Sequence, residues 1–144
     1  MPARYPERIV CLTEETTETL YLLGEERRIV GISGYTVRPP RARQEKPRVS
    51  AFLSAKQEKI LQLKPDLVIG FSDLQADIAR DLAKLGLNVL IFNQRSVQEI
   101  LDTIGMVASL VGASDKGAAL VGRLEKNLAA IRESAKAFPR RPRV

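Results

Sequence analysis

The sequence predicts an α/β fold: a parallel β-sheet with helices on both faces, in a Rossmann-like arrangement, followed by one long helix. Short apolar runs rich in β-branched residues alternate along the chain with stretches of helical periodicity. The first elements follow the order strand–helix–strand, which favours parallel pairing. Near the end of the chain, apolar residues recur at steps of three and four, which predicts a helix of about 24 residues.

Four strands are expected to be buried, because each is a short apolar run bounded by turn-forming or charged residues. They fall at residues 9–12, 29–32, 67–70 and 89–92. A very short additional strand is expected around Val49. The segment 33–47 is expected to be irregular, because its prolines exclude regular strand pairing.

Five helices are expected between and after these strands. Side chains able to cap a helix mark four of the starts: Thr13, Ser54 with Gln57, Ser96 with Glu99, and Ser114. Glycine or proline marks four of the ends: Gly24, Pro65, Gly86 and Gly112.

The last helix divides the chain into three parts. The apolar stripe of this helix is long enough that it must pack across a large surface. The stripe consists of Val121, Leu124, Leu128, Ile131, Ala135 and Phe138. The basic, proline-rich residues 139–144 look like a linker. We therefore expect a folded unit at 1–112, a connecting helix at 113–138, and at 139–144 the start of a linker to a second unit that the chain lacks.

Composition argues against several classes of protein. The net charge is +6, but the segments 36–48 and 132–144 each carry +4, so the surplus belongs to one loop and one tail. We therefore expect no nucleic-acid partner. With no histidine and only Cys11, a zinc or transition-metal site is not expected, and Cys11 is expected to be a buried, inert thiol.

The sequence is compatible with two cellular locations. No stretch approaches the roughly 20 apolar residues of a membrane helix. Residues 1–6 lack the apolar core of a secretory signal. Either a leader was removed and the protein is periplasmic or membrane-anchored outside the cytoplasm, or Met1 is the native start and the protein is cytoplasmic.

Ligands of an open parallel sheet bind beyond the carboxyl ends of its strands. That rule selects the segments 13–16, 33–36, 50–53, 71–74 and 93–96. They form a wall of mixed polar and aromatic groups that suits the binding of a large polar ligand. The candidate ligand-binding residues are Glu14, Glu15, Tyr35, Phe52, Phe71, Ser72, Asp73 and Arg95.

No catalytic residues are expected. The chain has no glycine-rich phosphate motif, and its serines have no histidine partner for a catalytic triad. A phospho-acceptor receiver domain remains an alternative, because Glu14 and Glu15 imitate its acidic cluster. However, Asp66 precedes its strand rather than following it, and no lysine follows Phe92.

Several segments resemble the helical-backbone (class III) substrate-binding proteins of cobalamin and iron-siderophore ABC transporters. The segment 6–20 resembles their opening, and 30–35 with Pro39 and Pro40 resembles their second strand and proline loop. The most specific match is 58–69. The resemblance covers nearly the whole chain but about half of a family member, and the Ser-Gly-Tyr pattern at 33–35 is closer to the cobalamin branch.

The resemblance implies a function for the protein and a role for each part of the chain. Residues 1–112 would be the N-terminal ligand-binding lobe and 113–138 the interlobe backbone helix. A corrinoid or ferric siderophore would bind in a cleft between two lobes and pass to a permease with its ATPase, without covalent chemistry or a resident cofactor. A leaderless intracellular corrinoid or metal-chelate carrier or sensor is the alternative.

The resemblance also implies two partner surfaces. Family members dock on permease arginines through a glutamate on the helix after the third strong strand. Here the matching position holds Ala76, and the nearest acid, Asp77, points about 100° around the helix. Without a second lobe, the exposed stripe of the last helix would favour a homodimer of this chain.

Overall fold

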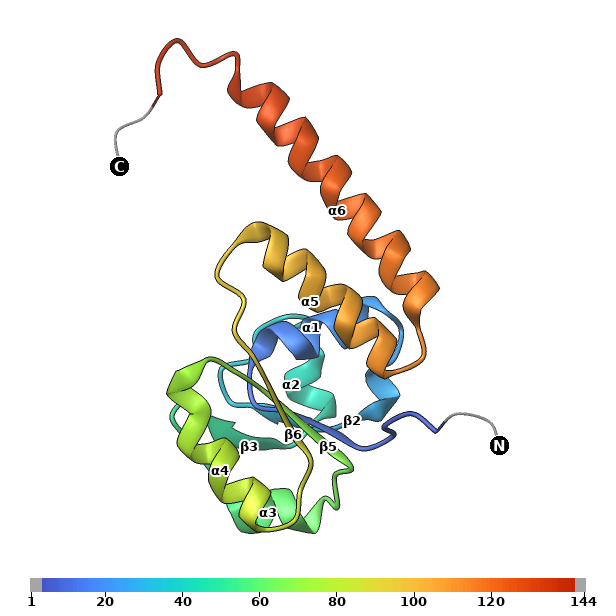
Figure 1. The fold of residues 1–144 in the computed structure, drawn as a ribbon, viewed down its shortest axis with the longest axis vertical. Helices are drawn as coiled ribbons and strands as arrows, with labels where there is room; N and C mark the ends of the chain where they lie inside the picture. Colours follow the sequence, from blue (N-terminus) through green and yellow to red (C-terminus); the bar gives the residue numbers. More distant parts are fainter. Residues whose placement is uncertain (1–3, 142–144) are drawn as a thin grey trace.

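The computed structural model describes residues 4–141, which form a six-stranded sheet with helices on both faces (Figure 1). The strand order is β4-β3-β2-β1-β5-β6, and every neighbouring pair is parallel except β3 and β4. The strands are β1 Ile9–Cys11, β2 Ile29–Ser33, β3 Arg48–Ala51, β4 Ser54–Ala55, β5 Leu67–Phe71 and β6 Val89–Phe92. The predicted parallel α/β sheet and its five expected strands are confirmed.

Within residues 4–141, six α-helices and two 3₁₀ turns surround the sheet. The α-helices are α1 Glu14–Leu22, α2 Ala42–Glu45, α3 Gln57–Gln62, α4 Ala76–Lys84, α5 Val97–Leu110 and α6 Ser114–Ala135. The 3₁₀ turns are η1 Glu26–Arg28 and η2 Asp73–Gln75. Figure 1 shows α3 and α4 on one side of the strands and α1, α5 and α6 on the other. No helix of the described residues is both long and apolar enough to cross a membrane.

Each face of the sheet has its own apolar core, because side chains alternate along a strand. In β1, Ile9 and Cys11 face the helices α1 and α5, whereas Val10 faces α3 and α4. Cys11 is fully buried as predicted, and burial raises the pKa of its thiol to about 11. The thiol therefore stays protonated and inert at neutral pH.

Two of the four predicted helix starts are wrong. Ser54 lies in β4, and α3 begins at Gln57 without a side-chain cap. Ser114 is the first residue of α6 rather than its cap. Thr13 occupies the cap position of α1 without making a capping hydrogen bond, whereas Ser96 does cap α5, because its Oγ accepts the backbone N–H of Glu99 at 3.2 Å.

The first turns of α6 pack closely on α5. Gly117 makes this possible, since a Cβ at this position would overlap the Cβ of Ala108 on α5. One turn further along, Leu120 is buried in the same core as Ala108. The absent side chain at Gly117 thus lets the two helices approach.

The far end of α6 leaves the body of the molecule. Figure 1 shows it extending beyond α5 and away from the sheet. Ile131 is 64% exposed and Phe138 67% exposed. The apolar stripe is therefore packed against the core at Val121 and Leu124 and exposed at its far end. Residues 142–144 of the expected linker lie outside the described residues.

Candidate functional site

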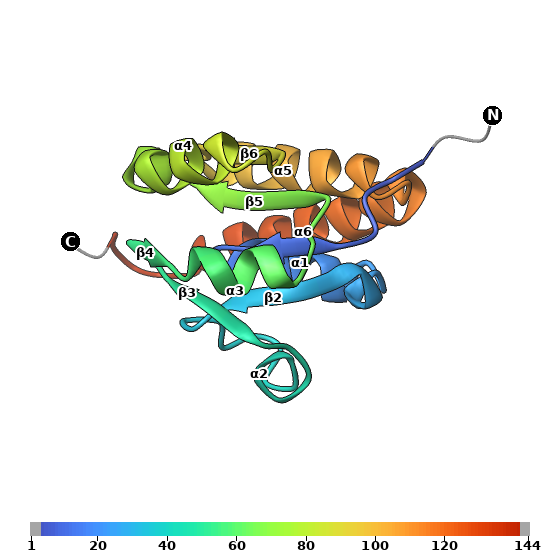
Figure 2. The same ribbon diagram turned by 90° about the horizontal axis from the view of Figure 1, so that it is seen from below.

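The carboxyl ends of the five parallel strands lie along one edge of the sheet (Figure 2). β1 occupies the middle of the sheet. The chain adds β2 and β3 on one side of it and then returns to add β5 and β6 on the other. The order in which strands are added therefore reverses between the parallel strands β1 and β5, and open α/β sheets bind their ligands at such a point. The loops that follow these strands form what we call the strand-end face.

One buried amide, Gln75, joins three of the loops on this face. Its Nε2 donates to the carbonyl oxygen of Leu12 at 3.3 Å and to that of Phe52 at 2.9 Å, while its Oε1 accepts the N–H of Phe71 at 2.9 Å. Gln75 is fully buried, and a Cβ at neighbouring Gly70 would lie 2.7 Å from its Oε1. The loops after β1, β3 and β5 are therefore held as one unit.

Three of the predicted ligand-binding residues form a cluster at the ends of β5 and β6. The guanidinium of Arg95 lies 5.0 Å from the ring centroid of Phe71, and its Nη2 lies 3.2 Å from Oδ1 of Asp73. Arg95 and Asp73 are both exposed. The cluster therefore offers an aromatic surface beside groups of both charges.

The loop that carries Arg95 is fixed by Glu99. Its Oε2 accepts the backbone N–H of Arg95 at 2.7 Å and the hydroxyl of Ser96 at 3.0 Å. The N–H of Arg95 and then the hydroxyl of Ser96 lower the pKa of Glu99. Its carboxylate thus stays ionised and keeps the cap of α5 intact at neutral pH.

Ser72 lies between Phe71 and Asp73 but has a different environment. It is fully buried, with a positive φ of 68°, and its Oγ accepts the N–H of Leu74 at 3.2 Å. A non-glycine residue in this conformation is uncommon. Here it turns the chain sharply from β5 into η2, so Ser72 shapes the loop that presents its two neighbours.

Tyr35 stands apart from this cluster, beyond the end of β2. It is 66% exposed, and its backbone N–H donates to Oγ of Ser33 at 3.2 Å. Glu14 reaches the same loop, because its Oε2 accepts the N–H of Val37 at 3.3 Å. Glu14 therefore holds the loop after β2 against the start of α1.

The remaining candidates are spread over the face. Phe52 is half-buried, and its carbonyl is held by Gln75. Glu15 is half-buried in the first turn of α1 and lines a small cavity of about 190 Å³ with Gln94 and Ile100. The structure thus places all eight candidates on or beside the strand-end face, but it brings only Phe71, Asp73 and Arg95 into mutual contact.

The loop that carries Tyr35 is anchored at its far end by a second cluster. The hydroxyl of Tyr21 donates to Oε2 of Glu45 at 2.6 Å, and the guanidinium of Arg41 lies 4.7 Å from the ring centroid of Tyr21. Arg41 also pairs with Glu26 at 2.9 Å. Burial, reinforced by Glu45, raises the pKa of Tyr21, so its phenol remains a donor. These contacts fasten α2 to α1 and η1.

Sequence reasoning missed a group of buried polar atoms. Among the described residues, five buried side-chain atoms have no hydrogen-bond partner, and four of these belong to segments at the carboxyl ends of strands. The four are Thr13 Oγ1, Thr36 Oγ1, Ser50 Oγ and Gln94 Oε1. Such atoms are rare in folded proteins. Their gathering here gives the strand-end face hydrogen-bonding capacity that the chain itself does not use.

Asp77, the candidate docking residue, lies on α4. Its side chain is 84% exposed, and its Oδ1 lies 2.8 Å from Nη1 of Arg80 on the same helix. Asp77 is thus accessible, with a flexible cation beside it. No cluster of three potential metal-binding residues occurs among residues 4–141.

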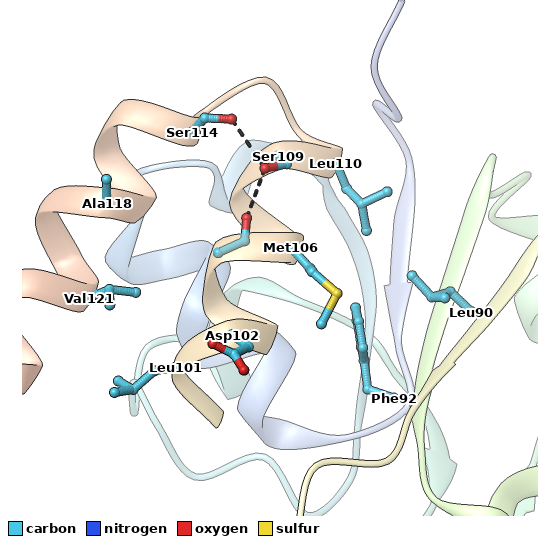
Figure 3. A pocket seen from close by; sticks show the side chains of 11 residues that line it. Leu90, Phe92, Leu101, Asp102, Met106, Ser109, Leu110, Ser114, Ala118 and Val121 are labelled. Atoms are coloured by element: carbon cyan, nitrogen blue, oxygen red, sulfur yellow. Dashed lines mark hydrogen bonds between the residues drawn. The ribbon is translucent and has the colours of Figure 1, made fainter. Parts of the chain in front are cut away.

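A separate apolar groove of about 820 Å³ runs between β6, α5 and the start of α6 (Figure 3). Figure 3 shows the side chains of Met106, Phe92 and Leu90 side by side along it. Ser109 and Ser114 close one end through a 3.2 Å contact between their hydroxyls. The groove presents few hydrogen-bonding groups to a polar ligand, unlike the strand-end face.

Comparisons with known proteins agree on one family. A sequence profile described as "periplasmic binding protein" matches residues 9–144. An ABC transporter substrate-binding lipoprotein of Bacillus subtilis is 31% identical over 135 residues, which are 91% of this chain and 42% of the relative. A vitamin B12-binding protein of Vibrio cholerae is 37% identical over 101 residues, which are 68% of this chain and 36% of the relative.

Solved structures give the same picture. The periplasmic vitamin B12 binding protein of Vibrio cholerae superposes with a TM-score of 0.80 at 28% identity, covering 92% of this chain and 52% of that one. The periplasmic heme-binding protein of Roseiflexus sp. RS-1 superposes with a TM-score of 0.81 at 28% identity, covering 94% and 52%. The chain therefore spans about half the length of the proteins it matches.

Proposed function

Because the chain belongs to the periplasmic binding protein family, we propose that it is the N-terminal half of the solute-binding component of an ABC importer. The ligand binds between the strand-end face and a second lobe, and the loaded protein delivers it to a permease. One relative is an ABC transporter substrate-binding lipoprotein, and two others are vitamin B12-binding proteins. The proposed role is accordingly binding and release, without covalent chemistry.

The observation that carries this proposal is the construction of the strand-end face. Gln75 fixes the loops after β1, β3 and β5, so their side chains are presented on a backbone that is ordered before ligand arrives. Preorganisation lowers the entropy lost on binding. The exposed ring of Tyr35 and the Phe71–Asp73–Arg95 cluster then supply aromatic and charged contacts to a large ligand with both apolar and polar parts.

The proposed ligand is a corrinoid or an iron chelate, with cobalamin first. Relatives whose names specify vitamin B12 or heme support this class of ligand. Such a molecule is cargo rather than a resident cofactor. We propose that binding takes place outside the cytoplasm, as the periplasmic and lipoprotein relatives suggest.

Calorimetric titration of the two-lobed protein with cobalamin, cobinamide, haem and several ferric siderophores tests the proposal. Saturable one-to-one binding of a corrinoid would support both the function and the ligand. Binding of haem or a siderophore instead would keep the receptor function and change its cargo. Failure of every ligand to bind would contradict the proposal.

Replacing Tyr35 tests whether the loop after β2 contacts the ligand. Tyr35→Ala is expected to weaken binding by about tenfold, as for removal of an aromatic contact at a binding site, with little change in melting temperature. Leu85→Ala is the matched control, because Leu85 is also exposed but lies at the end of α4. Equal affinities of the wild type and Tyr35→Ala would remove Tyr35 from the site.

Docking on the permease can be separated from binding of the ligand. Asp77→Lys is expected to reduce uptake by reconstituted transporter while leaving ligand affinity unchanged, because the side chain lies on α4 and is exposed. Asp102→Lys on α5 makes the same charge change on a different helix and should leave uptake intact. Unchanged uptake with Asp77→Lys would place docking elsewhere.

The same proposal accounts for the free half of α6. Its stripe is the surface on which a second lobe would pack. On its own, the chain is expected to associate with a second copy through this stripe. Sedimentation at increasing concentration would show the association, and Ile131→Asp should abolish it.

A further inference from the structure

A polar pocket of about 620 Å³ lies beside the strand-end face, at the β3–β4 edge of the sheet. Five of the ten residues that line it are basic and none is acidic. The basic residues are Arg43, Lys46, Arg48, Lys56 and Lys59. They come from two separate segments, one around α2 and β3 and the other at the start of α3.

The strand β3 explains how the two segments meet. Val49 packs into the core under α3 and α4, so the alternation of β3 turns Arg48 and Ser50 to the opposite face of the sheet. That is the face on which Ala42 of α2 is buried. Lys59 reaches β3 from α3, and its Nζ donates to the carbonyl of Arg48 at 2.9 Å.

Direct ion pairs within the described part of the chain do not neutralise the positive charge of this pocket. None of the five cations takes part in an ion pair among the described residues. Glu26 and Glu45 both pair with Arg41. Glu58 lies between Lys56 and Lys59 in sequence, but it pairs with neither and does not line the pocket. Lys46 and Lys59 donate to carbonyl oxygens, which are neutral partners. Like charges gathered around one cavity repel one another until an anion joins them.

The pocket also contains a hydroxyl with no assigned partner. Ser50 lines it, is only 8% exposed, and its Oγ makes no hydrogen bond within the described chain. A buried hydroxyl left without a partner costs folding free energy. An oxyanion beside Ser50 would accept that hydrogen bond while compensating the surrounding cations.

We propose that this pocket binds a small oxyanion carrying two or more negative charges, of the inorganic phosphate or pyrophosphate class. Arg48 and Lys56 supply charge, because their side chains make no hydrogen bond or ion pair with other described residues. Ser50 supplies the buried donor. The site goes beyond the proposed transport function and needs no second lobe, since all ten lining residues belong to this chain.

Calorimetric titration with inorganic phosphate and with pyrophosphate, at constant ionic strength, tests the site. Saturable one-to-one binding is expected, and tighter for pyrophosphate because it carries more charge. The double variant Arg48→Gln/Lys56→Gln is expected to weaken binding by about tenfold or more, as for loss of charged hydrogen-bond donors. Ser50→Ala should weaken it by roughly fivefold with the fold intact, because its hydroxyl has no partner to lose.

A charge-matched control separates a site from general attraction. Lys126→Gln/Arg132→Gln removes two exposed cations from the free half of α6 and should leave anion affinity unchanged. Binding that does not saturate, or that weakens equally in both double variants, would overturn the proposal. So would a Ser50→Ala protein that binds pyrophosphate as tightly as the wild type.

Discussion

Apolar residues recur with the same period in both halves of α6, but the two halves differ in burial. The first half is packed: Gly117 lies against Ala108, and Leu120 is buried. In the second half, Ile131 is exposed, and so is Phe138 just beyond the end of the helix. The period of a helix therefore identifies its apolar face, whereas burial depends on whether another element lies opposite that face.

Replacing one large apolar residue in each half of α6 should break this comparison most clearly. Leu120→Ala is expected to lower the free energy of unfolding by about 3 kcal/mol, because it leaves a cavity between α5 and α6. Ile131→Ala is expected to change it by less than about 0.5 kcal/mol, because the side chain is already exposed. Urea titration measures both, and equal losses would mean that the free half of α6 is packed in solution.

The two glycines of α6 provide a sharper test with a smaller effect. Gly117→Ala is expected to destabilise the protein by about 2 kcal/mol, since the added methyl overlaps Ala108. Gly122→Ala meets no atom within 4 Å and is expected to stabilise by about 0.5–1 kcal/mol through helix propensity. Thermal denaturation of both variants checks the signs, and a stabilising Gly117→Ala would contradict the close approach of α5 and α6.

An ion pair between Lys116 and Glu25 also joins the N-terminal end of α6 to the residue before η1, and this ion pair depends on pH. Glu25 lies 2.7 Å from Nε of the buried Arg28 and 3.6 Å from Nζ of Lys116 on α6. Desolvation raises the pKa of Glu25, but the hydrogen bond and charge of Arg28, with Arg27 and Lys116, outweigh it and hold the pKa below its ordinary value. The ionised carboxylate is therefore the form that the fold favours.

Glu25→Gln is accordingly expected to destabilise the protein by about 1.5 kcal/mol at neutral pH. Because the folded-state pKa is lowered, the contribution of Glu25 is fully present above its unfolded value of about 4.3 and is lost as pH falls through the folded value. Urea titrations at a series of pH values should thus show wild type and variant converging in acid. A difference that stays constant down to low pH would exclude the carboxylate charge as its cause.

Most of the sheet could be predicted from sequence because each main strand is a short apolar run with a clear boundary. The two residues of β4 and the four of α2 were missed, since elements so short carry no periodicity. Ser54 was misassigned for the same reason: its spacing to Gln57 fits a capping box, but pairing with Ala51 places it in a strand.

The candidate site could be predicted only at the level of segments. The rule for parallel sheets selects the loops, and the structure confirms that they share one edge. The rule does not tell which side chains contact each other, because the contact between Arg95 and Phe71 joins residues at the ends of two different strands. Gln75 was missed because no local pattern distinguishes a buried amide from an exposed one.

The bridging role of Gln75 limits how this protein can diversify. One amide fixes the backbone of three loops, so a change of loop length or path at any of them would leave buried donors and acceptors unpaired in the other two. Relatives that keep this amide are expected to differ in cargo through exchanged side chains on a conserved backbone. A relative that has remodelled one of these loops should have replaced the glutamine as well.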